Sequence, residues 1–205
     1  YLSMKNGIEK QIENNVPHRR FNPLSGEWIL VSPQRATRPW QGQVEESARV
    51  ELPEHDADCY LCSGNVRANG EINPIYRGPF VFDNDFPALL EDVDACDEEN
   101  DALFQRMSVS GVSKVICFSE RHDLTLPEMS VEKIRSIVDV WAALYEALGK
   151  TYRWVQIFEN KGAINGCSNP HPHGQLWASD AVPTLVARED ERKKAFMQDK
   201  GKNLL

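Results

Sequence analysis

The sequence predicts a single α+β or α/β domain, and three observations support this fold class. The chain has 205 residues, 41% of them hydrophobic, which is enough for one sizeable core. Short apolar runs rich in β-branched residues stand between segments of turn-forming residues, as strands do between loops. One longer segment, residues 130–149, repeats its apolar positions at helical spacing.

The N-terminal part predicts one strand within a basic segment. Residues 1–16 are polar and lack a pattern, so we expect a flexible tail there. The run "GEWILVS" at residues 26–32 is a short apolar strand candidate that Gly26 and Pro33 delimit. Five arginines against three glutamates between residues 17 and 49 make this segment locally basic. On charge alone, the simplest interpretation is a solvated surface.

Four more strands and an acidic loop are expected further along the chain. Seven acids and no base between residues 91 and 101 indicate a solvated loop, and nothing there requires a cation. The segment "GVSKVICFS" has the length and the β-branched content of a buried strand. The four strand candidates are residues 79–89, 111–119, 153–160 and 173–179.

Two helices complete the expected elements. In "SVEKIRSIVDVWAALYEALGK", Ser130 is a suitable N-cap, the apolar residues recur at helical spacing and Gly149 ends the helix. The charged segment "TLVAREDERKKAFMQDK" at residues 184–200 predicts a surface helix.

The charge and the apolar runs exclude two classes of partner. A formal net charge of −8 argues against nucleic acid, whose binding proteins carry basic stripes. No apolar run approaches the length of a membrane span, and the first residues lack the apolar core of a signal peptide. We therefore expect a soluble cytoplasmic protein with no membrane partner. Because the chain begins with Tyr1 and stops just after a charged segment, we also expect a fragment of a longer protein.

The cysteines indicate metal binding or catalysis rather than disulfides. There are five of them, an odd number, and they are scattered through a chain large enough to fold without disulfides. The spacing of Cys59 and Cys62 lets two thiolates reach one tetrahedral Zn²⁺. A second such pair is missing, so histidines would have to complete the site. The five histidines are His18, His55, His122, His171 and His173. The alternatives are two unrelated loop cysteines or a redox pair, although no thioredoxin-like context surrounds them.

Two of the five histidines flank one proline in "GCSNPHPHGQLWA", residues 166–178. Pro172 fixes its own φ, and in an extended chain His171 and His173 would face the same side. One imidazole could then be a metal ligand and the other a nucleophile or base; two structural histidines are the alternative. Gly174, which has no side chain, would let a phosphate approach the backbone.

With these motifs in view, the longer stretch "NKGAINGCSNPHPHGQLWA" resembles the active site of the galactose-1-phosphate uridylyltransferase family, a branch of the histidine-triad superfamily. Four other segments resemble that family in the same order, and the similarity runs from about residue 17 to about residue 195. They are "HRRFNPLSGEWILVSPQRATRPWQGQ", "HDADCYLCSGNVRANGEINP", "FDNDFPAL" and "WVQIFENKGA". The resemblance implies a histidine-triad-like domain over residues 17–205, with an antiparallel sheet flanked by helices and stabilised by zinc. This domain would be the first half of the family's chain.

The resemblance also implies an activity and roles for residues. The activity is exchange of a uridylyl group between UDP-glucose and galactose 1-phosphate, through a covalent intermediate on the nucleophile His173. The implied ligands of a structural zinc are Cys59, Cys62, His122 and His171. Gln175 and Ser168 would bind the transferred phosphate, Asn160 the nucleotide sugar, and Ala68, Asn84 and Asp85 the uridine.

Three further residues have implied roles that involve other parts of the family's assembly. Arg35 and Arg38 would reach the phosphates of a substrate in the neighbouring subunit of a homodimer. Glu189 would join a second iron or zinc site that the second half of the family's chain completes. Where hydrolases of the superfamily carry a third histidine, Gln175 offers an amide, which holds a phosphate but donates protons poorly.

Two other functions remain open from the sequence. One is a related nucleotide phosphorylase or adenylyltransferase of the same superfamily. The other is a zinc-stabilised module that binds a nucleotide without turnover.

Overall fold

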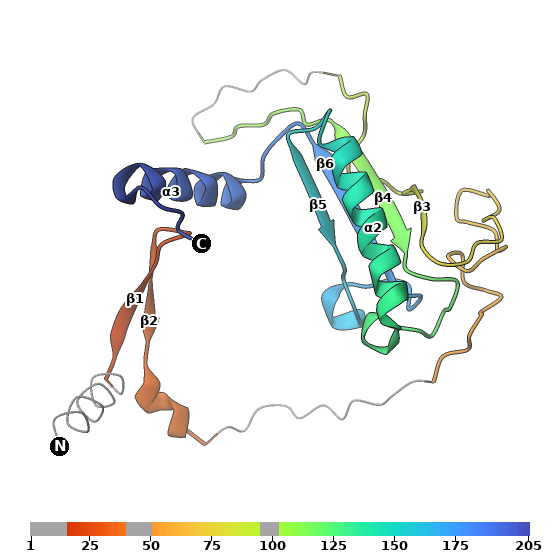
Figure 1. Ribbon diagram of the computed structural model, residues 1–205, viewed down its shortest axis with the longest axis horizontal. Coiled ribbons are helices and arrows are strands. Elements are labelled where there is room, and N and C mark those ends of the chain that lie inside the picture. Colours follow the sequence, from red (N-terminus) through yellow and green to blue (C-terminus); the bar gives the residue numbers. More distant parts are fainter. Residues whose placement is uncertain (1–15, 40–50, 95–102) are drawn as a thin grey trace. The chain divides into compact units, whose positions relative to one another are not determined.

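The computed structural model describes residues 16–39, 51–94 and 103–205 (Figure 1). The chain forms two compact units, one of residues 1–48 with 183–205 and one of residues 49–182. The predicted tail, apart from its last residue, and much of the predicted acidic loop lie outside the described residues. Our division of the chain into a tail and one domain over residues 17–205 stays a prediction.

The first unit contains a hairpin of strands β1 (His18–Asn22) and β2 (Glu27–Val31), with His18 opposite Val31. Strand β2 confirms the predicted strand. Strand β1 was not predicted, because "HRRFN" lacks the alternation of apolar residues that marks a strand. The tight turn accounts for it: Gly26 has φ 74° and donates its N–H to the Asn22 carbonyl at 2.8 Å, which returns the chain along β1.

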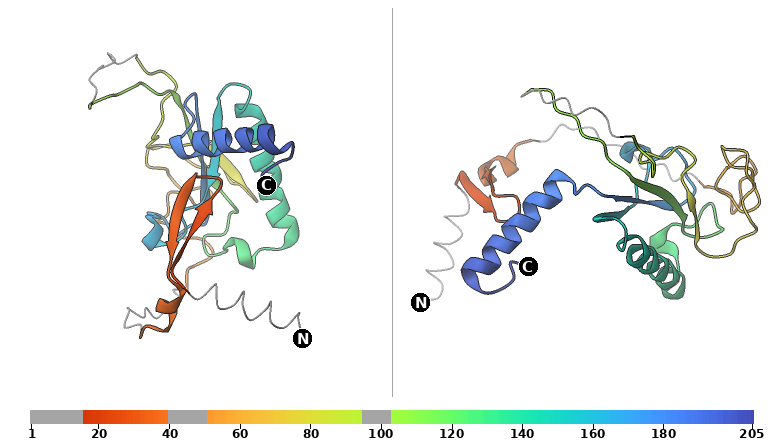
Figure 2. Two further views of the ribbon diagram at one scale, coloured as in Figure 1. Left: turned by 90° about the vertical axis from the view of Figure 1, so that its left-hand side faces the viewer. Right: turned by 90° about the horizontal axis from the view of Figure 1, so that it is seen from above.

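Helix α3 (Thr184–Lys200) also belongs to the first unit and spans the range predicted from the sequence. It lies beside the hairpin (Figure 2). Arg188 donates to Glu27 at 3.0 Å, and Arg192 lies over the ring of Phe21. Among the described residues of this unit, no side chain is fully buried. The hairpin and helix thus meet through polar and cation–π contacts and not through an apolar core.

The second unit is built on a four-stranded antiparallel sheet in the order β3-β4-β6-β5. Its strands are β3 (Phe80–Asp83), β4 (Gly111–Cys117), β5 (Trp154–Phe158) and β6 (His173–Ser179). Each lies within a segment predicted to be a strand. Six of the seven residues of β4 are buried, which confirms the expectation of a buried strand there.

Helix α2 (Val131–Leu148) covers one face of this sheet (Figure 1). As predicted, Ser130 caps it by accepting the N–H of Lys133, and Gly149 ends it. Between helix and sheet lies an apolar core. Its buried members are Val112, Ile116, Phe118, Met129, Ile137, Val155, Leu176 and Ala178.

The opposite face of the sheet carries a second cluster, to which β4 contributes Val115 and Cys117. Its other buried members, Cys59, Leu61, Cys62 and Tyr76, come from the long loop before β3. Neighbouring residues of a strand face opposite sides. Because Val115 pairs with Gln175 and Cys117 with His173, these two polar residues of β6 lie on the face away from α2.

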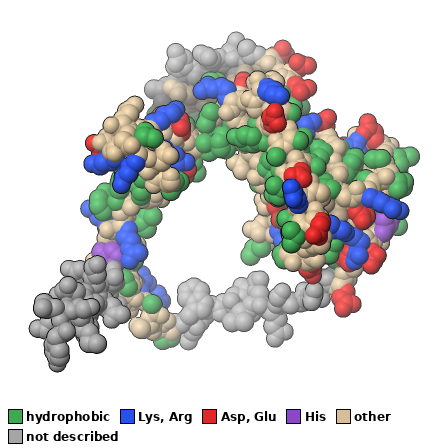
Figure 3. Space-filling model, in the orientation of Figure 1, with side chains coloured by type: hydrophobic (Ala, Val, Ile, Leu, Met, Phe, Trp, Pro, Cys, Tyr) green, Lys and Arg blue, Asp and Glu red, His purple; other side chains and the backbone are tan. Residues whose placement is uncertain are grey.

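The surface over α2 carries Lys, Arg, Asp and Glu side chains interspersed with one another (Figure 3). None of the helices in the described part of the chain combines the length and the apolar character that a membrane crossing requires.

Candidate functional site

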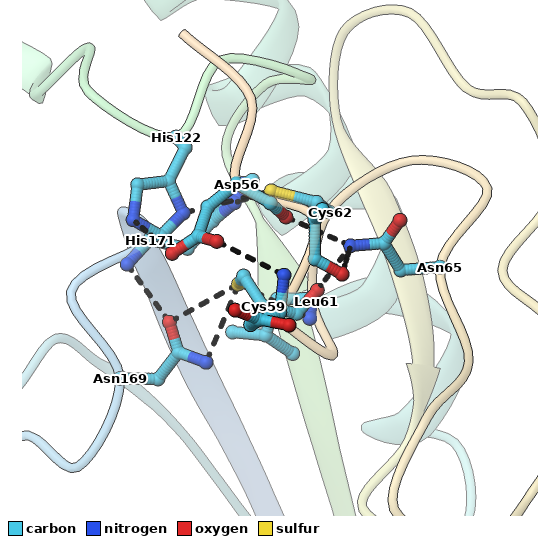
Figure 4. Close-up of polar contacts among 10 residues, drawn as sticks. Asp56, Cys59, Leu61, Cys62, Asn65, His122, Asn169 and His171 are labelled. Carbon is cyan, nitrogen blue, oxygen red and sulfur yellow. Dashed lines mark hydrogen bonds and ion pairs between the residues drawn. The ribbon is translucent and has the colours of Figure 1, made fainter. Parts of the chain in front are cut away.

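Two cysteines and two histidines form a buried cluster on the face of the sheet away from α2. The ligand atoms of Cys59, Cys62, His122 and His171 all lie within 4.8 Å of one another. The Sγ of Cys62 is 3.5 Å from Nδ1 of His122 and 3.4 Å from Nδ1 of His171 (Figure 4). The cysteines come from the loop before β3 and the histidines from the segments after β4 and before β6. The structure therefore brings together the four predicted ligands, in a set that could hold a metal ion.

The loop between the two cysteines has the backbone of a metal knuckle. The N–H of Leu61 points at Sγ of Cys59 at 3.4 Å, and the N–H of Cys62 donates to the Cys59 carbonyl at 3.1 Å. Each carbonyl of this turn accepts a side-chain donor, as buried peptide groups require. The donors are Asn65 Nδ2 to Cys59 (2.8 Å), Asn73 Nδ2 to Tyr60 (2.9 Å) and Cys62 (3.0 Å), and Tyr76 Oη to Leu61 (2.7 Å).

An outer hydrogen bond orients His171, and a carboxylate lies near the second nitrogen of His122 without a hydrogen bond to it. His171 donates Nε2–H to the Ser119 carbonyl at 3.0 Å, which leaves the lone pair of Nδ1 directed into the cluster. Nε2 of His122 lies 3.9 Å from the Asp56 carboxylate, on the side away from Cys62. Metal-bound histidines usually donate from their second nitrogen to a carbonyl or carboxylate, as His171 does. The donor set and its supports therefore fit a metal ion.

Burial favours the uncharged forms of two of these groups, Cys62 and His171. It raises the pKa of the Cys62 thiol to about 11 and lowers that of His171 to about 4, because the thiolate and the imidazolium would both lose water. A divalent cation reverses the effect on the thiol, since it stabilises the thiolate. Neutral imidazole is already the form that binds a metal.

His173 begins β6 and is half-buried beside the cluster. Its Nδ1 lies 2.7 Å from the carbonyl oxygen of His171. A carbonyl only accepts, so Nδ1 carries the proton and Nε2 keeps its lone pair. The N–H of Phe118 donates to the Pro172 carbonyl at 3.1 Å and extends the pairing of β4 and β6 up to this residue.

Packing gives Gly174 a reason of its own, and the predicted approach of a phosphate stays a prediction. A Cβ at this position would lie 3.1 Å from the ring of Phe118 and 3.1 Å from the carbonyl oxygen of Phe158. The glycine thus allows close packing on the α2 side of the sheet, opposite the face of His173. Approach of a phosphate is not needed to explain it.

Six predicted substrate residues line one cavity of about 210 Å³. They are Ala68, Asn84, Asp85, Ser168, His173 and Gln175. Their neighbours are apolar or aromatic, namely Tyr60, Leu61, Phe82, Phe86 and Val115. Flat rings beside a few polar groups are typical of small-ligand sites.

A buried arginine supports this first cavity. The guanidinium of Arg67 lies 3.6 Å from the carboxylate of Asp85, whose side chain is 6% exposed, and 4.5 Å above the ring of Phe82. Arg67 was not among the residues predicted from the sequence. The signal that could have indicated it is its position within "NVRANG", directly before Ala68.

His173 also lines a second cavity, of about 380 Å³. Asn160 and Ser168 line it, as do Lys161 and Cys167. The loop that forms its wall turns at Gly162 and Gly166, which have φ of 84° and 76°. His173 and Ser168 line both cavities.

The remaining predicted residues lie in the first unit. Arg35 is in a short 3-10 helix (Pro33–Thr37) and Arg38 ends it; both are exposed. Glu189 lies on α3, 3.9 Å from the ammonium of Lys193 one turn further along. These three residues therefore do not belong to the unit that carries the cavities.

Other polar residues of the site were not predicted. Asn65, Asn73 and Tyr76 hold the knuckle, and Ser119 orients His171 through its carbonyl. Asn169 lies within the motif but received no role, although its amide contacts both Cys59 and His171.

An antiparallel sheet with a helix on one face and a histidine-bearing Cys₂His₂ cluster on the other defines a histidine-triad-like α+β protein. Residues 6–183 match the family model described as galactose-1-phosphate uridyl transferase, N-terminal domain. The chain belongs to this family, which confirms the resemblance seen in the sequence.

Individual relatives agree with the family. The chain is 52% identical over 189 residues to a galactose-1-phosphate uridylyltransferase of Haemophilus influenzae, covering 92% of this chain and 54% of the relative. It is also 52% identical to that of Rattus norvegicus, covering 92% of this chain and 50% of the relative. The chain thus spans about half the length of these relatives.

Solved structures share the fold. An ADP-glucose phosphorylase from Arabidopsis thaliana with bound ADP-glucose has a TM-score of 0.63 at 22% identity, over 91% of this chain and 56% of that one. A uridylyltransferase has a TM-score of 0.60 at 24% identity, over 92% and 54%. These similarities support the predicted antiparallel sheet flanked by helices.

Proposed function

We propose that the protein containing this chain transfers a uridylyl group from UDP-glucose to galactose 1-phosphate, with His173 as the nucleophile. The observation that carries the proposal is the tautomer of His173. Its Nδ1 is fixed on the His171 carbonyl, so the neutral ring has its lone pair on Nε2, and the residue lines two cavities. The names of the relatives supply galactose 1-phosphate and the uridylyl group, and the family resemblance implies UDP-glucose as the donor.

In the first half-reaction, the lone pair of Nε2 attacks the α-phosphorus of UDP-glucose. An N–P bond forms as the bond from phosphorus to the bridging oxygen breaks, and glucose 1-phosphate leaves with that electron pair. The ring then carries a positive charge, which the hydrogen bond from Nδ1–H to the His171 carbonyl stabilises. A phosphate oxygen of galactose 1-phosphate next attacks phosphorus, which yields UDP-galactose and restores neutral His173.

Neither step needs a general acid, because the leaving groups are a phosphate and a neutral imidazole. Gln175 faces the same side of β6 as His173 and offers an amide donor to the transferred phosphate, and Ser168 offers a hydroxyl. An amide does not deliver protons, so Gln175 suits transfer to a sugar phosphate better than assisted hydrolysis.

The smaller cavity would hold the uridine. Phe82 and Tyr60 offer faces for the base, and Asn84 and Asp85 offer polar groups for the nucleoside, beside Ala68. Asn160, in the larger cavity, would contact the sugar.

We propose zinc as the ion of the Cys₂His₂ cluster, with a structural role. This donor set, two thiolates and two imidazoles, is typical of closed structural zinc sites. Bound there, the ion would tie together the loop before β3, the turn after β4 and the segment before β6. It would thereby fix the backbone of His171 that positions His173.

The roles of the first unit depend on further chain. We propose that Arg35 and Arg38 donate to the phosphates of a substrate in a second subunit of a homodimer. Their exposure leaves both guanidinium groups accessible to an anion. Glu189 would join iron or zinc at a second site whose other ligands lie outside this chain. The four cysteines among the described residues are free thiols, which suits a reducing cytoplasm.

The test uses the whole protein encoded by the reading frame that contains this chain. Incubation with UDP-glucose labelled in the α-phosphate should label the protein and release one equivalent of glucose 1-phosphate. Addition of galactose 1-phosphate should remove the label as UDP-galactose. Labelling by ADP-glucose instead would indicate an adenylyl-transferring relative, and binding without labelling would indicate a module without turnover.

A further inference from the structure

Asn169 is a buried side chain, 5% exposed, that contacts both the metal cluster and the backbone of the histidine loop. Its Oδ1 accepts the N–H of His171 at 2.9 Å. Since a backbone N–H only donates, this bond fixes which end of the amide is oxygen. Sγ of Cys59 lies 3.5 Å from both atoms of this amide: the thiol donates to Oδ1, and Nδ2 donates to Sγ, the only one of the two bonds that a thiolate keeps (Figure 4).

The amide of Asn169 helps to fix the backbone of the residue whose carbonyl orients the nucleophile. His171 is held at its N–H by Asn169 and at its ring Nε2 by the Ser119 carbonyl. The carbonyl of the same residue accepts Nδ1–H of His173 at 2.7 Å. Asn169 thus lies two hydrogen bonds away from His173 and one from a metal ligand.

The backbone of Asn169 also orders the loop on the cavity side. Its carbonyl oxygen accepts the thiol of Cys167 at 3.0 Å. Asn169 lines the larger cavity, but Oδ1 and Nδ2 both have partners inside the protein.

We propose that Asn169 is a positioning residue that couples the thiolate of Cys59 to the alignment of His173. A thiolate is a stronger acceptor than a thiol, so the bond from Nδ2 strengthens when a cation occupies the cluster. Metal occupancy then restrains Asn169, the backbone of His171 on both sides of its Cα, and the ring of His173 in turn. The part of the inference that concerns His173 rests on the proposed function; the contact with Cys59 does not.

The first test compares Asn169→Ala and Asn169→Asp in the whole protein loaded with Co²⁺. The Asp variant keeps an acceptor for the His171 N–H but places a carboxylate oxygen beside the thiolate. We expect both variants to shift the thiolate-to-cobalt absorption band and to lower kcat about 10- to 100-fold, with KM for UDP-glucose changed less than about 2-fold. Asn165→Ala is the matched control, because Asn165 bonds the Lys161 carbonyl in the same loop and contacts no ligand. Its cobalt spectrum should match that of the wild type.

The second test needs no variant and decides the matter if the substitutions prevent folding. In wild-type protein loaded with ¹¹³Cd²⁺, the side-chain amide protons of Asn169 should show scalar coupling to the metal through the N–H···S bond. An uncoupled Asn169 amide would overturn the proposal. So would an unchanged cobalt band, or a raised KM at unchanged kcat, which would make Asn169 a substrate contact.

The failure of this inference and that of the proposed function look different. If His173 is not the nucleophile, the coupling to cadmium and the shift of the cobalt band persist while kcat is unaffected. If Asn169 does not contact the thiolate, both spectroscopic signals are absent although His173 still becomes labelled.

Discussion

His171 and His173 are two residues apart and joined by a 2.7 Å hydrogen bond, but their imidazoles lie in different environments. The ring of His171 is fully buried with Nδ1 in the metal cluster, whereas that of His173 is half-buried and lines two cavities. The link runs through the backbone carbonyl of His171 and not through its ring. Substitutions at the two positions should therefore have separate effects.

We predict that His173→Gly abolishes covalent labelling by UDP-glucose and leaves the metal and the fold in place. The carbonyl of His171 loses only a partner that is half-exposed, so the free energy of unfolding should change by less than about 1 kcal/mol. Labelling, zinc content and denaturant unfolding of the whole protein measure the three effects. A His173→Gly variant that still formed the uridylyl adduct would place the nucleophile elsewhere.

His171→Ala should behave in the opposite way and lose zinc and stability together. It removes one of the four ligands and leaves the Ser119 carbonyl without its donor. The zinc content measured after gel filtration and the midpoint of unfolding should both fall. Full zinc content in this variant would exclude His171 as a ligand.

The zinc proposal predicts that chelation destabilises the protein. The whole protein should contain one tightly held zinc in the Cys₂His₂ cluster of each chain, and Cys59→Ser should remove it. Cys167→Ser is the control, since Cys167 donates to the Asn169 carbonyl and lies outside the cluster. Its zinc content should be unchanged. The proposed second site at Glu189 would also bind iron or zinc. The zinc content of each variant is therefore compared with that of the wild type, and the difference gives the zinc of the cluster.

Much of this fold could be predicted because the strands and helices of the second unit carry their own periodicity. The run of β-branched residues in β4 and the capped helix α2 show this clearly. Strand β1 could not be predicted, since its pairing depends on the turn at Gly26 and not on an apolar pattern of its own.

For the candidate site, spacing alone suggested a metal knuckle at Cys59 and Cys62. The choice of His122 and His171 came from the family resemblance, because sequence distance does not show which loops meet across a sheet. Asn73 and Tyr76 were missed for the same reason: they act on carbonyls that are near only in the folded chain.

The hydroxyl of Tyr76 should contribute to the stability of the knuckle. Tyr76 is 8% exposed, and its Oη donates to the Leu61 carbonyl at 2.7 Å. Tyr76→Phe leaves that buried carbonyl without this donor, so we expect a loss of about 1 to 3 kcal/mol in the free energy of unfolding. Urea unfolding of zinc-saturated protein measures it. Tyr145→Phe, on the exposed face of α2, is the control and should change stability by less than about 0.5 kcal/mol.

The last prediction concerns the arginines of the first unit. Arg35 and Arg38 are exposed, and the proposed function gives them phosphates to bind. Replacing either with Ala in the whole protein should weaken UDP-glucose binding by about 1 to 3 kcal/mol, the scale of a charge-assisted hydrogen bond. Arg20→Ala is the matched control, because Arg20 lies in the same basic segment and donates to Nε2 of His18. Calorimetric titration on a nucleophile-free His173→Gly background measures binding without turnover. If both arginine variants bind as tightly as the Arg20→Ala control, the basic segment is a solvated surface and the phosphate role is wrong.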